Sequence, residues 1–594
     1  MRTAKMSGCS FSPDERSILI TSNLSGSYNA YLIPLSGGPP RPLFEETGTH
    51  LHAISYFPHD HRVLVQMDLD GQESAHLGVL EPDGRTRVLT SGHGVQALFR
   101  GWSADGKFFY CSTNEREAHR DDLYKISTDD YRSTPFNSEL SDRLDFHGFS
   151  PDERYAVFDR NESDITNILY LKDHRTGELF PITPETEGVL SLPVGFDPES
   201  SSLYFLTNED DEFLYLARYE LKTGRSEVFR KYPGDVRLSR LSRRGRYCVS
   251  TYCAPDGDRV EIYDFESGLP LRPRNLPEGE IRSVYLSNSE RFMVLYVGHD
   301  RAPNDLYLHD LETGETRRLT DNLNPEIDPE DLVESRPVSF RSFDGLEIPC
   351  LLWRPHGASA AHRVPALVLV HGGPGGRTRR TYNGTIQFLV NRGYAVLGVN
   401  HRGSSGSGRT FYEADVKKQG REPLWDCIEA RRYLSGLDFI RPDRIGIIGG
   451  SFGGYMVLAA LTFHPDEFAA GVDICGISNW LRAIDSLPPT WESGPRRVFL
   501  RKVGDPETDY EMLRSISPVY HADRIRAPLM ILQGALDPRV PRIESDDMVE
   551  TIRRHAGTVE YLVFPDEAHG FRRRSNSILA YRAIADFLDR HLKG

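Results

Sequence analysis

Apolar and polar positions in the first half of the chain repeat one pattern seven times. Each copy has an aromatic or apolar residue, a turn rich in Pro, Asp, Ser and Gly, and then an alternating apolar run. Alternation is typical of β-strands, and a second apolar run and another turn follow each copy, so every unit predicts antiparallel hairpins. The copies begin at Phe11, Phe57, Trp102, Phe149, Phe196, Leu241 and Leu286, at spacings of 46, 45, 47, 47, 45 and 45 residues.

A repeat of this length predicts a ring of small sheets. One unit makes a sheet whose apolar faces it cannot bury alone, so neighbouring units must stack. An open β-sandwich array and a β-solenoid are the alternatives, but the period is too long for a solenoid coil. Radial stacking of four-stranded blades leaves only short protected edges, so we expect a seven-bladed β-propeller over residues 1–325. We interpret His59, Asp60 and His61, in the polar turn of the second copy, as a solvated loop rather than a metal site.

The pattern changes after residues 321–335, an acidic, proline-containing segment that we interpret as a linker. From Arg336 onward, short apolar strands alternate with stretches that have the 3.6-residue period of helices. This is typical of a mostly parallel, doubly wound sheet, which we expect over residues 326–594, with its chemistry at the carboxyl ends of the strands. The strands are expected within residues 364–373, 394–403, 444–450, 468–476, 527–535 and 559–571, and helices over 421–436 and 451–464.

A serine lies at the end of one predicted strand. The sequence GGSFGGY at residues 449–455 runs from that strand into a helix and places Ser451 in the pattern GxSxG. This pattern lifts the serine clear of the sheet on a strained turn, where glycines let the backbone pass closely. Because the flanking strand and helix distinguish it from a chance Gly-Ser loop, we expect Ser451 to be a nucleophile.

A serine nucleophile needs a base that a carboxylate orients, and in this fold the chain order is serine, acid, histidine. Asp537 follows the strand within residues 527–535, and His569 follows the next strand, so both fall at the expected edge of the sheet. Asp473 and Asp566 are competing acids that we rank below Asp537. The weaker histidine candidates are His464, His521 and His555.

The oxyanion that forms on acyl attack needs hydrogen-bond donors placed in advance. One is expected to be the backbone N–H of Phe452, the residue after the nucleophile. The second is expected from the loop HGGPGG at residues 371–376, where we choose the N–H of Gly373, with a plain glycine turn as the alternative. We interpret His371, at the strand end, as a structural hydrogen-bonding residue rather than the base.

Composition and charge narrow the class of protein. The chain has 594 residues, of which 39% are hydrophobic and 26% charged, so it is globular and too long for one core. Residues 1–330 carry −19 and residues 331–594 carry +4, which make up the net charge of −15. The acidic first half disfavours nucleic acid and anionic membranes as partners.

Cysteine usage and apolar run lengths indicate the compartment. Seven cysteines without a CxxC pair indicate buried free thiols in a reducing environment. The N-terminus lacks the apolar core of a signal peptide, and no run approaches the roughly 18 apolar residues of a membrane span, so we expect a soluble cytoplasmic protein. No phosphate loop or cluster with metal-ligand spacing interrupts the repeats, and we expect neither a cofactor nor a metal.

Several stretches of the second half resemble the prolyl oligopeptidase-like serine peptidases. They are HGGPGG, NHRGSSGSGRTF, GGSFGGYM, SPVYHADRI, LDPRVP and DEAHGF, and they look most like the acylaminoacyl-peptidase and dipeptidyl-peptidase branches. The resemblance implies a seven-bladed propeller that caps an α/β-hydrolase domain. It also implies that Ser451, Asp537 and His569 are nucleophile, acid and base, and that the amides of Gly373 and Phe452 are the oxyanion donors.

The resemblance further implies substrate-binding residues. The family's arginine two residues after the catalytic Asp falls on Arg539 and would bind a substrate carbonyl next to the cleaved residue. A salt bridge from Arg539 to a nearby acid is the alternative. The family's apolar specificity pocket falls on Phe452, Ile477, Trp480 and Val540.

Two departures from the family affect the expected function. The paired glutamates with which dipeptidyl peptidases hold a free amino terminus have no evident counterpart, and the leading helix of acylaminoacyl peptidases looks short or missing. We expect a serine peptidase that acts on short peptides, acylaminoacyl-peptidase or aminopeptidase-like, whose propeller excludes folded proteins, and that assembles as a homo-oligomer. The alternatives are an esterase or amidase of small acyl substrates and a non-catalytic propeller scaffold, against which the complete set of Ser451, Asp537 and His569 speaks.

Overall fold

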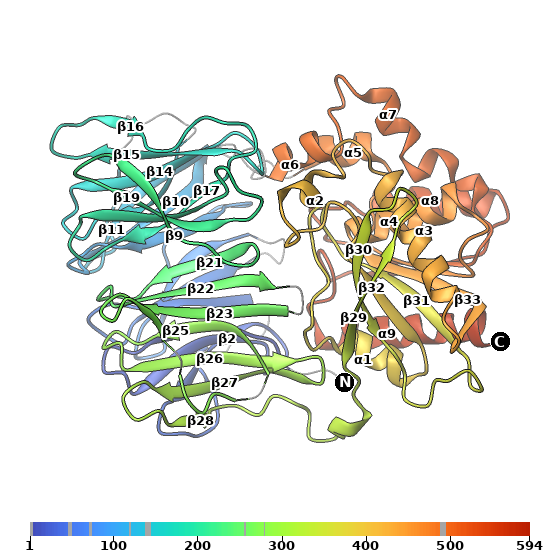
Figure 1. Ribbon diagram of the computed structural model, residues 1–594, viewed down its shortest axis with the longest axis horizontal. Helices are drawn as coiled ribbons and strands as arrows, with labels where there is room; N and C mark the ends of the chain where they lie inside the picture. The colour runs from blue at the N-terminus through green and yellow to red at the C-terminus, as the bar shows by residue number, and fades with distance from the viewer. Residues whose placement is uncertain are drawn as a thin grey trace.

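The computed structural model has a β-propeller followed by an α/β-hydrolase domain, which lie side by side in Figure 1. It describes residues 4–44, 50–69, 74–117, 120–136, 144–254, 257–271, 273–277, 279–487 and 495–594. The seven four-stranded blades and the mostly parallel sheet that the sequence predicts are both confirmed. The split at residue 325 stays a prediction; the last blade strand ends at Arg318, and the first hydrolase strand begins at Ser335, after a short turn of 3₁₀-helix, η1 (Pro329–Asp331).

Each blade is an antiparallel sheet of four strands that are consecutive in the chain. The first three blades are β1 (Met6–Phe11), β2 (Ser17–Ser22), β3 (Asn29–Pro34), β4 (Arg41–Pro42); β5 (His50–Tyr56), β6 (Val63–Asp68), β7 (His76–Leu80), β8 (Thr86–Val88); and β9 (Ala97–Trp102), β10 (Phe108–Glu117), β11 (Arg120–Ser127), β12 (Ser133–Pro135). The next two are β13 (Asp145–Phe149), β14 (Tyr155–Asn161), β15 (Asn167–Asp173), β16 (Leu179–Pro181); and β17 (Ser191–Phe196), β18 (Ser202–Thr207), β19 (Tyr215–Glu220), β20 (Arg225–Arg230). The last two are β21 (Val236–Leu241), β22 (Tyr247–Ala254), β23 (Gly257–Asp264), β24 (Leu269–Leu271); and β25 (Glu280–Leu286), β26 (Phe292–His299), β27 (Ala302–Asp310), β28 (Thr316–Arg318).

The repeated turn between the first two strands of a blade has its own hydrogen-bond pattern. A side chain at the start of the turn accepts from the backbone of the next strand, as when Ser12 Oγ accepts from the N–H of Ser17 at 3.1 Å. Later in the turn comes a residue with left-handed backbone, where glycine is also favoured. These residues are Glu15, Glu153, Ser200 and Glu290, with φ of 51°, 54°, 53° and 63°, and Gly106 and Gly245. The composition of the repeated turn follows from these two requirements.

The ring closes by contacts between the first and last blades, each of which keeps its own four strands. Glu15 Oε1 accepts a hydrogen bond from the backbone N–H of Ser289 at 2.6 Å, and Glu15 Oε2 accepts from the Ser289 hydroxyl. Apolar residues of β1 to β3, including Phe11 and Ile18, share one buried cluster with Val294 and Leu306 of the seventh blade. Side-chain packing therefore closes the propeller without an exchanged strand.

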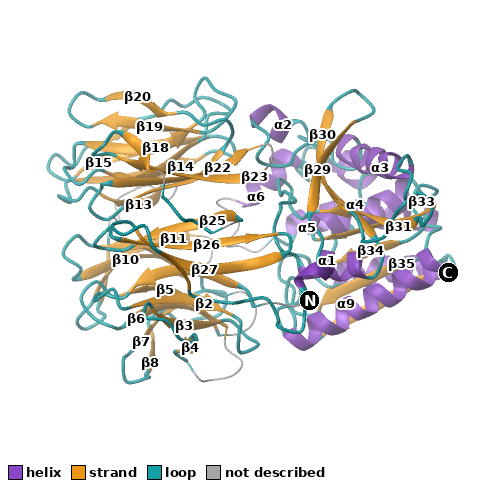
Figure 2. Cartoon of the chain, turned by 60° about the horizontal axis from the view of Figure 1, so that its bottom comes forward, coloured by secondary structure: helices purple, strands orange, loops and turns teal. Residues whose placement is uncertain are grey.

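The hydrolase sheet has the order β29-β30-β32-β31-β33-β34-β35-β36 and is parallel from β32 onward, with β29 and β30 antiparallel. Its strands are β29 (Ser335–Arg341), β30 (Glu347–Trp353), β31 (Val364–Val370), β32 (Ala395–Val399), β33 (Ile440–Gly450), β34 (Gly471–Ile474), β35 (Leu529–Gly534) and β36 (Val559–Phe564). The helices are α1 (Gly384–Asn391), α2 (Arg409–Glu413), α3 (Glu422–Ser435), α4 (Phe452–Phe463), α5 (Trp480–Asp485), α6 (Pro495–Lys502), α7 (Tyr510–Ser515), η3 (Pro518–Arg524), α8 (Ile543–Arg554), α9 (Arg574–Leu588) and η4 (Asp589–Lys593). Figure 2 shows that the helices gather in this domain. All six predicted strands and both predicted helices are confirmed.

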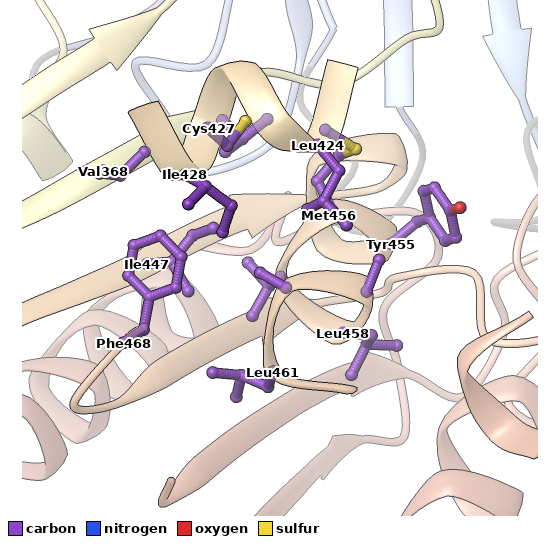
Figure 3. Packing of buried hydrophobic residues seen from close by; sticks show 14 of the residues in the cluster. Val368, Leu424, Cys427, Ile428, Ile447, Tyr455, Met456, Leu458, Leu461 and Phe468 are labelled. Atoms are coloured by element: carbon purple, nitrogen blue, oxygen red, sulfur yellow. The ribbon is translucent and has the colours of Figure 1, made fainter. Parts of the chain in front are cut away.

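Apolar residues cover both faces of the hydrolase sheet. On one face, α3 and α4 pack against β31 and β33, and Figure 3 shows Leu424, Ile428 and Met456 in this layer. A second buried cluster, with members from α1 and α9, covers the other face. The nucleophile helix α4 is therefore anchored in the core. All seven cysteines are free thiols, and all except the half-buried Cys9 are buried, as the sequence predicts.

The two domains meet through charged side chains of opposite sign. On the hydrolase side, Arg501 of α6 donates to the Asp164 carboxylate of the fourth blade at 2.8 Å, and the Tyr412 hydroxyl donates to the same group at 2.9 Å. Arg572 lies 3.1 Å from Asp68 of the second blade. Part of the negative charge of the propeller therefore forms ion pairs with arginines of the hydrolase domain.

Candidate active site

Ser451 lies on a tight turn between β33 and α4, with φ of 57° and ψ of −122°. Three glycines around it have no room for a side chain, because a Cβ would lie 2.3 Å from another atom in each case. At Gly449 that atom is the Gly453 carbonyl oxygen, at Gly453 it is the Val370 carbonyl oxygen, and at Gly454 it is Asp473 Oδ1. The close passage of backbone explains the glycines of the pattern and holds the strained serine in place.

Asp537 and His569 form a buried hydrogen-bonded pair. Asp537 Oδ2 lies 2.7 Å from His569 Nδ1, while its Oδ1 accepts from the backbone N–H groups of Arg539 and Val540, each at 2.9 Å. The turn after β35 therefore aims the carboxylate at the histidine. The Asp537 side chain is 0% exposed and that of His569 is 13% exposed, so Nδ1 is engaged while the ring still reaches the cavity.

Ser451 and His569 line one cavity of about 440 Å³. Among the described residues no hydrogen bond joins their side chains, and in unliganded hydrolases this contact is often long and shortens when substrate binds. The rest of the wall is mostly apolar. It consists of Gly373, Pro374, Ile477, Trp480, Ala483, Leu487, Val498, Phe499, Arg539 and Val540.

The cavity contains most, but not all, of the residues that the sequence points to. Ile477, Trp480, Arg539 and Val540 lie in its wall. The Phe452 ring does not; it is fully buried, with its centroid 5.9 Å from that of His401 and 6.3 Å from that of Trp480, so Phe452 can offer the cavity only its backbone. Sequence reasoning missed Ala483 of α5 and the wall residues of α6, where the only signal is the pair Val498 and Phe499 amid the arginines of α6.

The HGGPGG loop approaches the nucleophile closely. A Cβ on Gly372 would lie 3.6 Å from Ser451 Cβ, and a Cβ on Gly376 would lie 2.0 Å from the Gly372 carbonyl oxygen. Gly373 itself lines the cavity. Phe452 is the first residue of α4, where a backbone N–H has no partner within the helix. Gly373 thus shares a cavity wall with Ser451, and the Phe452 N–H has no partner within α4, so these two amides stay our candidates for the oxyanion donors.

His371 is held as a neutral structural residue. Its Nε2 lies 2.8 Å from Ser404 Oγ, and its ring stacks on that of His401 with the centroids 4.7 Å apart. Burial and the neighbouring His401 lower the pKa of His371 to about 3. Such an imidazole is a weak base, which agrees with the structural role that the sequence suggests.

The competing acids do not contact His569. Asp566 lies near the surface, 2.9 Å from Arg573, and accepts a hydrogen bond from Asn576. Asp473 is buried beside Gly454, and neither of its carboxylate oxygens has a hydrogen-bond partner that meets the usual geometry among the described residues. Burial raises the pKa of Asp473 to about 8. Of the three acids, only Asp537 is hydrogen bonded to the histidine.

A buried thiol lies next to the Asp537–His569 pair. Cys475 Sγ, an Asp537 oxygen and a His569 nitrogen all lie within 4.8 Å of one another. Burial and the nearby Asp537 and Asp473 carboxylates raise the pKa of the Cys475 thiol.

Within the described part of the chain, no helix is long and apolar enough to cross a membrane.

We call the tight turn that carries Ser451 the elbow. Together with the Asp537–His569 pair at neighbouring strand ends and the HGGPGG loop, it defines a serine hydrolase of the α/β-hydrolase class, capped by a propeller. Residues 380–594 match the family model described as the prolyl oligopeptidase family. Over these residues the hydrolase domain therefore belongs to the prolyl oligopeptidase family of serine peptidases.

Relatives and solved structures agree with this assignment. The chain is 29% identical to dipeptidyl aminopeptidase BIII of Pseudoxanthomonas mexicana, over 98% of this chain and 86% of that protein. It is 26% identical to an acylamino-acid-releasing enzyme of Arabidopsis thaliana, over 39% of this chain and 30% of that protein. In fold it is similar to a puromycin-hydrolyzing peptidase of Mycobacterium tuberculosis, with a TM-score of 0.84 and 20% identity over 99% of this chain and 94% of that one. The family is one of peptidases, which favours peptide bonds over the small acyl esters of the alternative hypothesis.

Proposed function

We propose that Ser451, His569 and Asp537 hydrolyse peptide bonds through an acyl-enzyme. Because Asp537 engages Nδ1 of His569, Nε2 is the atom that takes the Ser451 proton as Oγ attacks the carbonyl carbon. The N–H groups of Gly373 and Phe452 bind the oxyanion, and His569 then protonates the leaving amine. Water, deprotonated by the same nitrogen, releases the acyl group. The observation that carries the proposal is the single cavity lined by Ser451, His569 and Gly373.

The proposed substrates are short peptides with an apolar residue before the cleaved bond. The cavity next to Ser451 is walled by Ile477, Trp480, Phe499 and Val540, which favour an apolar side chain by removing it from water. Arg539, in the same wall, supplies the charged donor for a backbone carbonyl of the substrate. The full-length similarity to a dipeptidyl aminopeptidase supports aminopeptidase-like cleavage of such peptides, and we keep acylated peptides as the second candidate.

We further propose that the propeller admits only unfolded peptides, and that the protein acts in the cytoplasm as a homo-oligomer. The contacts Arg501–Asp164 and Arg572–Asp68 hold the two domains together over the site, which supports exclusion of folded proteins. The free buried thiols support a reducing compartment.

The proposal is tested with three matched chromogenic substrates that share one apolar residue: a free-amino dipeptide amide, an acylated amino-acid amide and a simple ester. We expect the free-amino peptide to have the highest kcat/KM, and Arg539→Ala to lower kcat/KM for peptides more than for the ester. Higher kcat/KM for the acylated substrate would favour the second candidate. Hydrolysis of the ester alone would contradict peptidase activity.

A further inference from the structure

A second cavity, of about 310 Å³, lies between the propeller and the hydrolase and shares no lining residue with the active-site cavity. The propeller contributes residues of β23 and β25, whose blades face the hydrolase in Figure 1. The hydrolase contributes β29, β30 and the segment 377–380, which continues the HGGPGG loop. The charged groups of its wall are Arg282, Arg377, Arg379, Arg380, Asp258, Glu280 and Glu347.

The three acids of this wall only partly balance its four arginines; Asp258 Oδ2, for example, lies 3.8 Å from Arg282 Nη1. Asp258 Oδ2 accepts a hydrogen bond from Arg237 at 2.7 Å, and Glu347 accepts from the Ser339 hydroxyl at 2.5 Å. Glu280 Oε2 lies 3.0 Å from Arg282 Nη2, but neither atom has a partner with hydrogen-bond geometry among the described residues. Positive charge in the cavity is therefore incompletely balanced.

Arg379 has the least compensation of its charge by acidic side chains among the arginines of this wall. Its side chain makes no hydrogen bond or ion pair with any residue that the structure describes, and its Nε is buried. Burial and the nearby Arg237 lower the pKa of Arg379, and the Asp258 carboxylate opposes this shift only in part. Arg282, on the propeller side, has a side chain only 11% exposed, and its Nε has no hydrogen-bond partner among the described residues, although Nη1 and Nη2 lie 3.8 and 3.0 Å from Asp258 and Glu280. Leaving a partly buried charge unpaired is costly, so Arg379 favours a bound anion, and Arg282 offers the same anion its unused Nε donor.

The backbone next to Arg379 is held in place. The N–H of Thr378 donates to Asn400 Oδ1 at 2.7 Å, and Asn400 Nδ2 donates back to the Thr378 carbonyl at 3.3 Å. Asn400 is itself tied to β30, because its N–H donates to the Pro349 carbonyl at 3.0 Å. The segment that carries the arginine is thus fixed to the sheet, which supports a built site rather than a mobile surface charge.

We propose that this cavity binds a small phosphate-type oxyanion that joins Arg282 of the propeller to Arg379 of the hydrolase. Guanidinium groups bind such anions with paired donors, and a tetrahedral oxyanion has enough acceptors for arginines that approach from two sides. The cavity is large enough for free phosphate with water or for the phosphate of a small organic ester. Its occupant links the two domains, and is therefore expected to stabilise their closed arrangement.

Calorimetric titration of the full chain with inorganic phosphate, and in a second arm with glycerol phosphate, tests the proposal at constant ionic strength against chloride. We expect saturable binding, and at least a tenfold loss of affinity in Arg379→Gln and in Arg282→Gln. Arg526→Gln, which removes an exposed arginine paired with Asp466, should bind as the wild type does. Tighter binding in one arm identifies free phosphate or an ester as the preferred source.

Melting temperatures measured in chloride alone and with added phosphate give a second readout. Arg379→Gln removes an unpaired charge, so it should melt no lower than the wild type in chloride. Phosphate should raise the melting temperature of the wild type and of Arg526→Gln, but not that of Arg379→Gln. Arg379→Lys, which keeps the charge but loses the paired donors, serves if the Gln variant fails to fold, and should also bind at least tenfold more weakly. Phosphate binding no better than chloride, or unchanged in Arg379→Gln, overturns the site. Loss in Arg379→Gln but not in Arg282→Gln overturns the link between domains.

Discussion

The propeller and the hydrolase both place a residue other than glycine in the left-handed conformation, with different consequences. Glu15 in the first blade has φ of 51°, and Ser451 in the elbow has φ of 57°. Glu15 uses its carboxylate to hold the seventh blade through Ser289, and the repeat places glutamate or serine at similar turns of other blades. Ser451 is surrounded by glycines and opens onto a cavity with a histidine. A positive φ therefore serves assembly in one region and chemistry in the other, and the neighbouring residues decide which.

Replacing the strained serine should have the largest effect on activity. Ser451→Ala removes the nucleophile, and kcat for peptide hydrolysis is expected to fall by about 10⁶. Alanine is no less strained at this φ, so the melting temperature should stay close to that of the wild type. Glu15→Ala is the matched variant and should retain kcat. Turnover near the wild-type value in Ser451→Ala would disprove the assignment.

Neutralising the acid should have the next largest effect. Asp537→Asn keeps the shape but removes the charge that orients and stabilises the protonated His569, so kcat should fall by about 10⁴. The measurement is kcat on a peptide substrate, with Asp566→Asn as the control, since Asp566 binds surface residues only. Equal losses in the two variants would show that Asp537 has no special role.

The buried carboxyl of Asp473 in the hydrolase contrasts with the Glu15 carboxylate of the propeller, because Glu15 is hydrogen bonded to Ser289 and Asp473 has no such partner among the described residues. With its pKa raised to about 8, Asp473 stays protonated in the folded state while the unfolded chain ionises it near its usual 3.8. The free energy of unfolding should therefore fall by about 1.4 kcal/mol for each pH unit between pH 4 and 8 on account of this group. Asp473→Asn removes that dependence, so its melting temperature should rise relative to the wild type as pH increases to 8. A constant difference across this range would contradict the burial argument.

A methyl group at a glycine near Ser451 should change the free energy of unfolding by less than the ionisation of Asp473 does between pH 4 and 8. Gly453→Ala places Cβ 2.3 Å from the Val370 carbonyl oxygen, which should destabilise the protein by about 1–3 kcal/mol and lower kcat by moving Ser451. Gly450→Ala is the matched control, because its Cβ would meet no atom closer than 3.6 Å. Denaturant unfolding and kcat of both variants are the measurements. Similar stability of the two would show that the elbow tolerates a side chain.

The smallest effect is expected at the propeller turn. Glu15→Ala loses the hydrogen bonds to Ser289 and keeps the strained backbone, so stability should fall by about 1 kcal/mol. Glu15→Gln retains an acceptor and should lose less. Both effects are read from the melting temperature, and no change in Glu15→Ala would mean that packing alone closes the ring.

Periodicity and short patterns predict much of this molecule. The seven blades follow from a repeat that recurs along the chain, and the elbow follows from GGSFGGY because only glycine fits where the backbone passes another strand. The order of Ser451, Asp537 and His569 follows from strands that end at one edge of the sheet.

Contacts between distant segments are not predictable from such patterns. The cavity wall contributed by Phe499 depends on how α6 folds over the site, and α6 reads in the sequence as a charged helix. The pairing of Asp164 with Arg501 joins residues of two domains, and nothing local in the sequence marks either as a partner. Arg379 likewise reads as one of several arginines in a loop, and only the folded structure shows that its Nε is buried without a hydrogen-bond partner among the described residues.

The most direct test of the central claim, that Ser451 is the nucleophile, is mass spectrometry of the protein after reaction with an organophosphonate. The account predicts a single covalent adduct on the peptide that contains Ser451, no adduct in Ser451→Ala, and slower labelling in Asp537→Asn, because the Asp537–His569 pair activates the serine. An adduct on another residue, or labelling of Ser451→Ala at the wild-type rate, would contradict it.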